Sequence, residues 1–295
     1  MRDTFWVGVH IVGLRVMKLH FAVLALLICL EYKAFADAPL PQILYSCPVL
    51  ITLANGSFGS GLFLNSSNHF FLVTAGHVLF DKHSHVLISG KAEVSWHLDE
   101  GTNHYFSAIS VNLDFLNTNN QIKLHSTHDV AVVRLCSVLP DGRQVYQANE
   151  FVCTTTNFEP VIISNTSMRR FADVTIGNDA FVFGYPSSIG LKASPQFDYT
   201  RPLLRRGIIA GINPEAKTII IDAPVFFGNS GGPVLEKRST FTETQYAVVG
   251  IVTQYIPFYD VWDSEQYQIH NVSVSNSGYS VVEPIDFVME LLWDN

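Results

Sequence analysis

The chain has 295 residues, of which 48% are hydrophobic and 15% are charged, and its formal net charge is −8 at pH 7. This length and composition are those of a globular protein with one large or two small cores. The acidic balance argues against nucleic-acid binding, because phosphate groups are bound by basic surfaces.

The N-terminal segment predicts export. Lys18 precedes an apolar run at residues 21–30, and Ala-Phe-Ala at residues 34–36 has the small-x-small pattern of a cleavage site. These three features are typical of a signal peptide. We therefore expect residues 1–36 to be removed, with Met17 as an alternative start, leaving a periplasmic or secreted protein with no stable membrane insertion. An uncleaved N-terminal anchor is the alternative, disfavoured because the apolar run is short for a membrane span.

Three cysteines, Cys47, Cys136 and Cys153, remain after such a cleavage. An odd number in an exported chain allows one disulfide and one free thiol, and three buried thiols are the other interpretation. Their spacing does not match a structural zinc site, and His83 and His85 are better explained as a solvated turn than as metal ligands. The sequence therefore predicts no metal and no cofactor.

Short apolar runs dominate the chain between about residues 42 and 282. Examples rich in β-branched and aromatic residues lie at 49–53, 181–183, 218–221 and 247–252, separated by Gly, Asn, Ser and Pro. Many short strands with frequent turn signals predict an all-β sandwich or barrel.

The last segment predicts a single helix. After Pro284, the residues Ile285, Val288, Met289 and Leu292 recur at i, i+3, i+4 and i+7. That spacing is the apolar stripe of an amphipathic helix, and proline is tolerated in its first turn.

Three short blocks carry the chemistry. Residues 74–78 (Thr-Ala-Gly-His-Val) end one apolar run, and His128-Asp129 opens another at residues 130–135. The third block is Gly-Asn-Ser-Gly-Gly-Pro at residues 228–233. A histidine, an aspartate and a serine at the edges of strand-like segments are the three parts of an activated serine nucleophile.

In this order and spacing the blocks resemble those of the chymotrypsin/trypsin-like serine peptidases. Gly-Ser-Gly at residues 59–61 and Gly-Tyr-Pro at 184–186 are similar to bacterial trypsin-like and HtrA-type members. Animal digestive members have an aspartate before the serine, where this chain has Asn229, so activation by insertion of a new N-terminus is not expected. Only about 60 residues follow the serine block, and we expect no appended PDZ domain.

The resemblance implies the fold. It predicts an all-β protein of two six-stranded antiparallel β-barrels with a C-terminal α-helix. The first barrel, within residues 37–165, would carry the histidine and the aspartate, and the second, within 166–295, the serine and the helix. The segment 157–173, which contains Arg169 and Arg170, is the best candidate for the connection between them.

The resemblance also implies the roles of the site residues. Ser230 would be the nucleophile, His77 its general base, and Asp129, which lies 52 residues after the histidine, the group that orients the imidazole. The backbone N–H groups of Gly228 and Ser230 would form the oxyanion hole.

The specificity pocket is predicted from position. Its base in the family lies six residues before the nucleophile, which is Pro224 here, and its walls include Val252 and Thr253. Because the base position is not acidic, we expect an apolar pocket for small or medium aliphatic side chains and no preference for Lys or Arg.

The sequence thus predicts an exported serine endopeptidase that acts on polypeptides. A catalytically latent or inactive binding protein on the same fold is the alternative, and the presence of all three triad residues favours the enzyme. An esterase of the α/β-hydrolase type is disfavoured, since its Gly-x-Ser-x-Gly motif does not match the sequence around Ser230.

Overall fold

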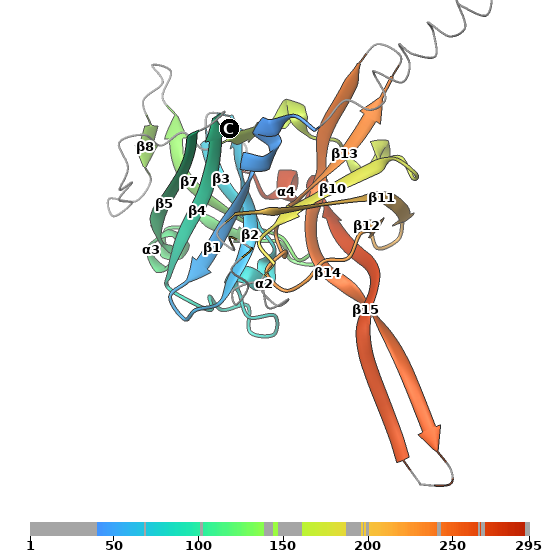
Figure 1. Ribbon diagram of the computed structural model, residues 1–295. Coiled ribbons are helices and arrows are strands. Elements are labelled where there is room, and N and C mark those ends of the chain that lie inside the picture. Colours follow the sequence, from blue (N-terminus) through green and yellow to red (C-terminus); the bar gives the residue numbers. More distant parts are fainter. Residues whose placement is uncertain are drawn as a thin grey trace, which may run out of the picture. The chain divides into compact units, whose positions relative to one another are not determined.

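The computed structural model in Figure 1 describes residues 40–67, 69–100, 103–138, 144–146, 161–186, 196, 198, 201–240, 243–264, 266 and 269–292. The predicted signal peptide, Cys153 and residues 157–160 of the predicted connection lie outside these ranges.

The chain divides into two units, Met1–Leu40 with Arg238–Gln245 and Pro41–Lys237 with Tyr246–Asn295. In the smaller unit, the Thr240 N–H donates to the Glu243 carbonyl at 2.8 Å. The larger unit contains the predicted site residues and most of both sheets.

The first sheet has nine strands in the described residues. They are β1 (Pro48–Leu53), β2 (Phe58–Ser66), β3 (His69–Thr74), β4 (Lys91–Glu100), β5 (Asn103–Asn112), β6 (Ile122–Leu124), β7 (Ala131–Val138), β8 (Gln144–Tyr146) and β9 (Ile162–Ser164). Their order is β5-β4-β1-β2-β3-β7-β6, with β8 beside β7 and β9 beside β2. The β2–β9 pair is parallel and the others are antiparallel.

Short helices connect these strands. The α-helices are α2 (Gly76–Leu79) and α3 (Leu113–Thr118), and the 3₁₀ helices are η1 (Gln42–Ser46), η2 (Asn165–Ser167) and η3 (Phe171–Asp173). The helix α3 begins at Asn112, whose side chain accepts a hydrogen bond from the Phe115 N–H at 3.1 Å. That is a typical asparagine N-cap.

Aromatic side chains fill the core of the first sheet. Phe63 stacks on Phe70 with ring centroids 5.0 Å apart and meets the edge of Trp96 at 5.5 Å. All three side chains are buried. They come from β2, β3 and β4, so the apolar faces of three strands pack on one another and fix the position of the chain that follows β3.

The second sheet is a closed barrel of six strands, in the order β10-β11-β12-β15-β14-β13. Its strands are β10 (Asp179–Gly184), β11 (Leu203–Asn213), β12 (Thr218–Asp222), β13 (Pro233–Ser239), β14 (Thr244–Ser264) and β15 (Ile269–Pro284). Small and β-branched side chains fill it, including Val182, Ile209, Ile221, Val249 and Val282. Such residues suit the pleated, inward-facing positions of a narrow barrel.

The predicted fold class is confirmed. The protein is mostly β, with two antiparallel sheets and a C-terminal helix, and the second sheet closes into the expected ring of six strands. The first sheet is a half-barrel with more strands than the resemblance implies. Its two ends, β5 and β6, are not hydrogen-bonded to each other in the described residues.

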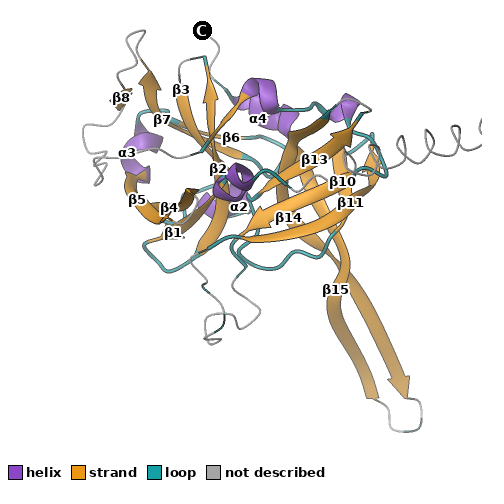
Figure 2. Ribbon diagram, turned by 45° about the horizontal axis from the view of Figure 1, so that its top comes forward, coloured by secondary structure: helices purple, strands orange, loops and turns teal. Residues whose placement is uncertain are grey.

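The C-terminal helix α4 spans Ile285–Leu291. It buries Ile285, Phe287, Val288 and Leu291, and Pro284 is its N-cap. A proline at this position costs no helical hydrogen bond, because the first N–H groups of a helix have no partner within it. Figure 2 shows α4 beside the first sheet, and the helix contacts both β7 and β15.

A buried ion pair stabilises the start of the second sheet. Arg169 donates to the carboxylate of Glu236 on β13, and both side chains are buried. The same carboxylate accepts hydrogen bonds from the Thr175 N–H at 3.1 Å and the Asn178 side chain at 2.5 Å. The stretch predicted as a connection therefore contains a residue anchored in the barrel.

Cys47 and Cys136 are buried and their thiols are free. Burial raises the pKa of each thiol to about 12, which makes both unreactive at neutral pH. Within the described ranges, no helix has the length and apolar character needed to cross a membrane.

Candidate active site

His77 lies in α2, the one-turn helix that follows β3. Its backbone N–H donates to Asp129 Oδ1 at 2.8 Å, and its ring Nδ1 lies 2.6 Å from Asp129 Oδ2. Since a carboxylate only accepts, Nδ1 carries the proton and Nε2 is left free to act as a base. The Gly76 N–H also donates to the Asp129 backbone carbonyl at 3.1 Å.

The helix α2 and the loop that carries Asp129 approach each other closely at Gly76. A Cβ on Gly76 would lie 3.0 Å from Asp129 Oδ1 and 2.8 Å from the Leu124 side chain. The glycine that precedes the histidine in the sequence block therefore allows the aspartate to reach the imidazole.

The environment of Asp129 keeps it ionised. Burial alone raises the pKa of this carboxyl, but hydrogen bonds from the side chain and backbone of His77, and the charge of His77, outweigh burial. The net pKa of Asp129 lies below its ordinary value. A carboxylate that stays charged can hold the neutral imidazole in one tautomer and stabilise the imidazolium.

Ser230 follows a tight turn formed by residues 226–229. The Asn229 N–H donates to the Phe226 carbonyl at 3.0 Å, and Gly228, the third residue of the turn, has φ +95°. Phe227, the second residue of the turn, does not have a positive φ. Only a type II turn combines these features, and a change to type I would rotate the Phe227–Gly228 peptide by about half a turn.

Two backbone donors are available at this turn. Within the described part of the chain, neither the Gly228 N–H nor the Ser230 N–H donates to a protein acceptor. The direction of the Gly228 N–H follows from the turn type, so the glycine fixes where that donor points.

Ser60 on β2 ties the serine turn to the first sheet. Its hydroxyl donates to the Gly228 carbonyl at 2.6 Å and accepts from the Tyr185 N–H at 3.0 Å. Its backbone N–H donates to the Ser230 carbonyl at 2.8 Å, and its carbonyl accepts from the Thr74 hydroxyl at 2.7 Å. One fully buried serine thus contacts both the serine turn and the segment that leads to His77.

The second glycine of the serine block is also required by close packing. Gly231 has φ +86°, and a Cβ there would lie 2.1 Å from the Ser60 carbonyl and 2.3 Å from Thr74 Oγ1. Any side chain at this position would push the serine turn away from Ser60 on β2 and from Thr74, which precedes the helix that carries His77.

The three predicted catalytic residues come from both sheets. His77 and Asp129 are in direct contact, whereas the Ser230 hydroxyl donates to the Thr253 carbonyl at 3.2 Å. Among the described contacts, no hydrogen bond joins Ser230 to His77. Serine–base contacts are often loose in the absence of substrate, and the hydroxyl can rotate about a single bond.

A cavity of about 290 Å³ opens beside His77. It is lined by Gly76, His77, Phe80, Asp81, Lys82, His85, Leu124, His125, Ser126, Thr127, His128, Asp129, Thr253, Gln254 and Glu283. Of the predicted pocket residues, Thr253 lines this cavity, while Pro224 and Val252 do not. The lining is mostly polar, so this side of the site suits hydrogen-bonding groups.

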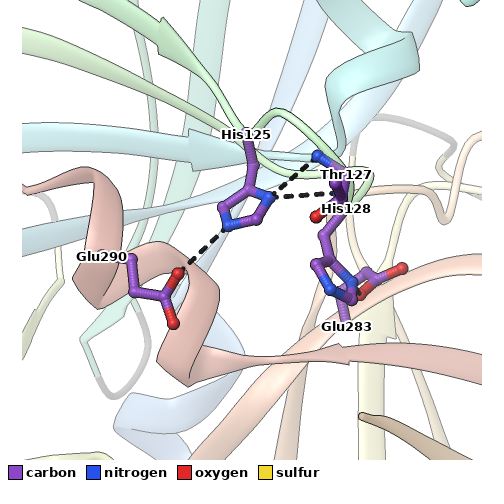
Figure 3. A network of polar contacts seen from close by, with 5 residues as sticks. All are labelled: His125, Thr127, His128, Glu283 and Glu290. Atoms are coloured by element: carbon purple, nitrogen blue, oxygen red, sulfur yellow. Dashed lines mark hydrogen bonds and ion pairs between the residues drawn. The ribbon is translucent and has the colours of Figure 1, made fainter. Parts of the chain in front are cut away.

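Sequence reasoning missed a second set of histidine–carboxylate pairs next to Asp129, drawn in Figure 3. His128 Nδ1 lies 2.9 Å from Glu283 at the end of β15, and His125 Nε2 lies 3.2 Å from Glu290 on α4. The two imidazoles also contact the ring of Phe287, with His128 stacked on it at 3.4 Å. These contacts join the loop that carries Asp129 to the C-terminal helix.

Glu283 is the buried member of this set. Burial and the nearby Asp129 carboxylate raise its pKa, while hydrogen bonds from His128 and the Asp129 backbone lower it, and the net pKa lies above the ordinary value. The only sequence signal for this residue was its place just before the proline that starts the helix.

No metal site accompanies these residues. The described residues contain no group of three or more His, Cys, Asp or Glu side chains arranged to hold an ion. His83 and His85 lie in an exposed loop in which the N–H groups of His83 and Ser84 donate to the Asp81 carboxylate.

One known protein family matches more than half of the chain. A family model described as "Trypsin-like peptidase domain" matches residues 59–242. A search of curated proteins finds no match.

Several solved structures are similar to this chain at low sequence identity. A serine endoprotease from Yersinia pestis is 17% identical, with a TM-score of 0.44, and the alignment covers 86% of this chain and 66% of that one. Deg5 is 18% identical, with a TM-score of 0.45 and coverage of 84% and 88%. The HtrA-type protease AlgW, solved with a tripeptide, is 15% identical, with a TM-score of 0.45 and coverage of 85% and 62%. The chain thus spans less than two thirds of the Yersinia pestis and AlgW chains.

Proposed function

From the premise that the chain belongs to the trypsin-like peptidase family, we propose that it is an exported serine endopeptidase. The observation that carries the proposal is the His77–Asp129 contact, in which a carboxylate with a lowered pKa holds the imidazole 2.6 Å away. That arrangement is what a serine nucleophile requires of its base.

In the proposed reaction the Ser230 hydroxyl turns from the Thr253 carbonyl towards His77 and attacks the carbonyl carbon of a peptide bond. His77 Nε2 accepts the hydroxyl proton and then donates it to the leaving amine. Asp129 stabilises the imidazolium that forms between these two steps. Water then hydrolyses the acyl-enzyme by the same route.

The Gly228 and Ser230 N–H groups are the proposed oxyanion hole. Support comes from the type II turn and from the lack of a protein acceptor for either donor in the described residues. Each such donor is worth about 3–4 kcal/mol of transition-state stabilisation in related systems.

The proposed P1 pocket includes Pro224, Val252 and Thr253, and we expect it to prefer small or medium aliphatic side chains. Val252 is fully buried and Thr253 nearly so, while Pro224 is partly exposed. Profiling with a P1 peptide library tests this, and a preference for Lys or Arg would contradict it.

Export is proposed from residues 1–36. Expression of the full chain in a host with a secretory pathway, followed by N-terminal sequencing of the exported protein, tests it. A mature N-terminus at Asp37 supports cleavage after Ala36, whereas retention of the apolar run supports an N-terminal anchor.

The central experiment is labelling of the purified protein with a fluorophosphonate probe, next to Ser230→Ala and His77→Ala variants. Labelling of the wild type alone supports an activated serine. The Ser230–Thr253 contact is the observation that supports the alternative, a latent or inactive binding protein. It predicts no labelling of any folded form.

A further inference from the structure

Within the described residues, the strand β14 has an edge next to Ser230 that no further strand covers. Its ladder with β13 ends where the Gly231 N–H donates to the Val252 carbonyl at 2.7 Å and the Val252 N–H donates to the Gly232 carbonyl at 3.0 Å. The carbonyl of the next residue, Thr253, accepts a hydrogen bond from the Ser230 hydroxyl. From there to Ser264, β15 is the strand that pairs with β14 in the described residues.

This part of β14 continues into a two-stranded arm, which we define as residues 257–264 of β14 and 269–276 of β15. The arm begins after a shift in strand register between Tyr255 and Pro257, and its ladder runs from Pro257↔Asn276 to Ser264↔Ile269. Figures 1 and 2 show the arm extending beyond the closed barrel in both views. An isolated hairpin of this kind is only marginally stable in water, which suggests that it is retained for a contact.

The middle of one face of the arm is apolar and exposed. Tyr259 pairs with Val274 and Val261 with Val272, so their four side chains share a face. These side chains are between 45% and 60% exposed. Exposed apolar clusters of this kind mark surfaces that bind a partner.

The opposite face has a different character. Phe258 pairs with Ser275 and Trp262 with Asn271, and the Trp262 indole donates to the Asp260 carboxylate at 2.8 Å. Here the aromatic side chains alternate with polar ones. The Tyr259–Val274 face instead has four adjacent apolar side chains and ends at the Asp263–His270 ion pair.

We propose that the arm is an extended substrate-binding surface. It would take an extended, apolar segment of an unfolded polypeptide, on the same chain that lies at Ser230. The inference rests on the proposed function. The edge on which β-strand addition can occur begins at the nucleophile and leads directly into the apolar face of the arm.

Two features favour this occupant over others. Pro257 has no N–H, so an unbroken backbone ladder along this strand is disfavoured for any added strand, and contact with the arm is expected through the side chains of the Tyr259–Val274 face. Residues 253–284 contain no Lys or Arg and include Asp260 and Asp263. An anionic membrane surface would be repelled by such a segment.

The test compares a face variant with a matched control. The face variant carries Tyr259→Thr, Val261→Thr, Val272→Thr and Val274→Thr, because threonine retains strand propensity while removing apolar surface. The control variant carries Ile43→Thr, Ile162→Thr and Ile176→Thr, at exposed positions outside the arm. The substrates are β-casein, an unfolded apolar protein, and a four-residue ester too short to reach the arm.

We expect the face variant to raise KM for β-casein about tenfold, which corresponds to about 1.4 kcal/mol of binding, with kcat unchanged. Hydrolysis of the ester and fluorophosphonate labelling should match those of the wild type and the control. An equal effect on both substrates, or no effect on β-casein, overturns the inference.

Binding measured in a Ser230→Ala background separates this inference from the proposed function. Fluorescence anisotropy of labelled β-casein should show about tenfold weaker binding when the face substitutions are added. If the wild type is not labelled by fluorophosphonate but this difference persists, the peptidase proposal fails and the arm remains a polypeptide-binding surface. If the wild type sediments as a dimer that the face variant dissociates, and β-casein binding is unchanged, the arm binds a second copy and the inference is wrong.

Discussion

Ser60→Ala tests whether the first sheet controls the serine turn. The substitution removes a hydroxyl that donates to the Gly228 carbonyl at 2.6 Å and accepts from the Tyr185 N–H at 3.0 Å, and it leaves the backbone contacts of Ser60 in place. The Ser60 side chain is fully buried. Water is therefore not expected to replace either bond.

The expected magnitude follows from these two bonds. A buried donor or acceptor left without its partner costs about 1–3 kcal/mol, so the free energy of unfolding should fall by roughly 2–6 kcal/mol for the two together. A loosened turn also no longer fixes the direction of the Gly228 N–H. We therefore expect kcat to fall by roughly 10²-fold, as when an oxyanion donor is lost.

The assay is steady-state hydrolysis of a short peptide ester, with urea unfolding measured in parallel. Ser95→Ala is the matched control, since Ser95 is a buried serine of the same sheet on β4. A purely structural role for Ser60 would lower stability and leave kcat of the folded protein equal to that of the control. A rise in KM with unchanged kcat would also refute the reasoning, since an oxyanion donor acts in the transition state.

Three further predictions follow from the same geometry. Gly228→Ala should lower kcat by roughly 10²–10³-fold in steady-state assays, because alanine at φ +95° costs about 1–2 kcal/mol and favours the type I turn; an unchanged kcat would exclude the predicted hole. Glu236→Ala should lower the free energy of unfolding in urea by about 3–5 kcal/mol, since it leaves the buried Arg169 without its carboxylate, while fluorophosphonate labelling of the folded protein stays the same. Because the pKa of Asp129 is lowered in the folded state, its stabilising effect is present above its unfolded pKa of about 3.9 and is lost as pH falls through the lower folded value. The difference in unfolding free energy between wild type and Asp129→Asn should therefore shrink below about pH 4, and a difference that grows with acidity would contradict it.

The sequence could predict the parts of the site that are local in the chain. The turn around His77, the turn that carries Asp129 and the glycine-rich turn before Ser230 each depend on a few adjacent residues, so short motifs were enough to find them. The strand character of the segments around them was also readable from their β-branched and aromatic composition. The contact between His77 and Asp129 was inferred from the resemblance, not from the residues alone.

What the sequence could not predict depends on pairs far apart in the chain. Ser60 and Gly228 are separated by 168 residues, and the pattern Gly-Ser-Gly gives no sign of a hydrogen bond between them. Arg169 was predicted to lie in the connection between the two halves, and its partner Glu236 lies 67 residues further on. The arm was missed for another reason: alternating apolar and polar residues predict a strand, but not whether a third strand will cover its edge.

The candidate site is built so that its two sheets depend on each other. The base and its aspartate come from the first sheet and the nucleophile from the second, but the serine turn also hydrogen-bonds to Ser60, a residue of the first. The Tyr185 hydroxyl adds a further contact across the sheets, donating to the Pro48 carbonyl at 3.2 Å. A small displacement of one sheet against the other therefore moves the Gly228 N–H and His77 relative to Ser230 before any strand unfolds. Because catalysis requires donors placed to within a fraction of an ångström, activity should be a more sensitive reporter of the packing between these sheets than secondary structure is.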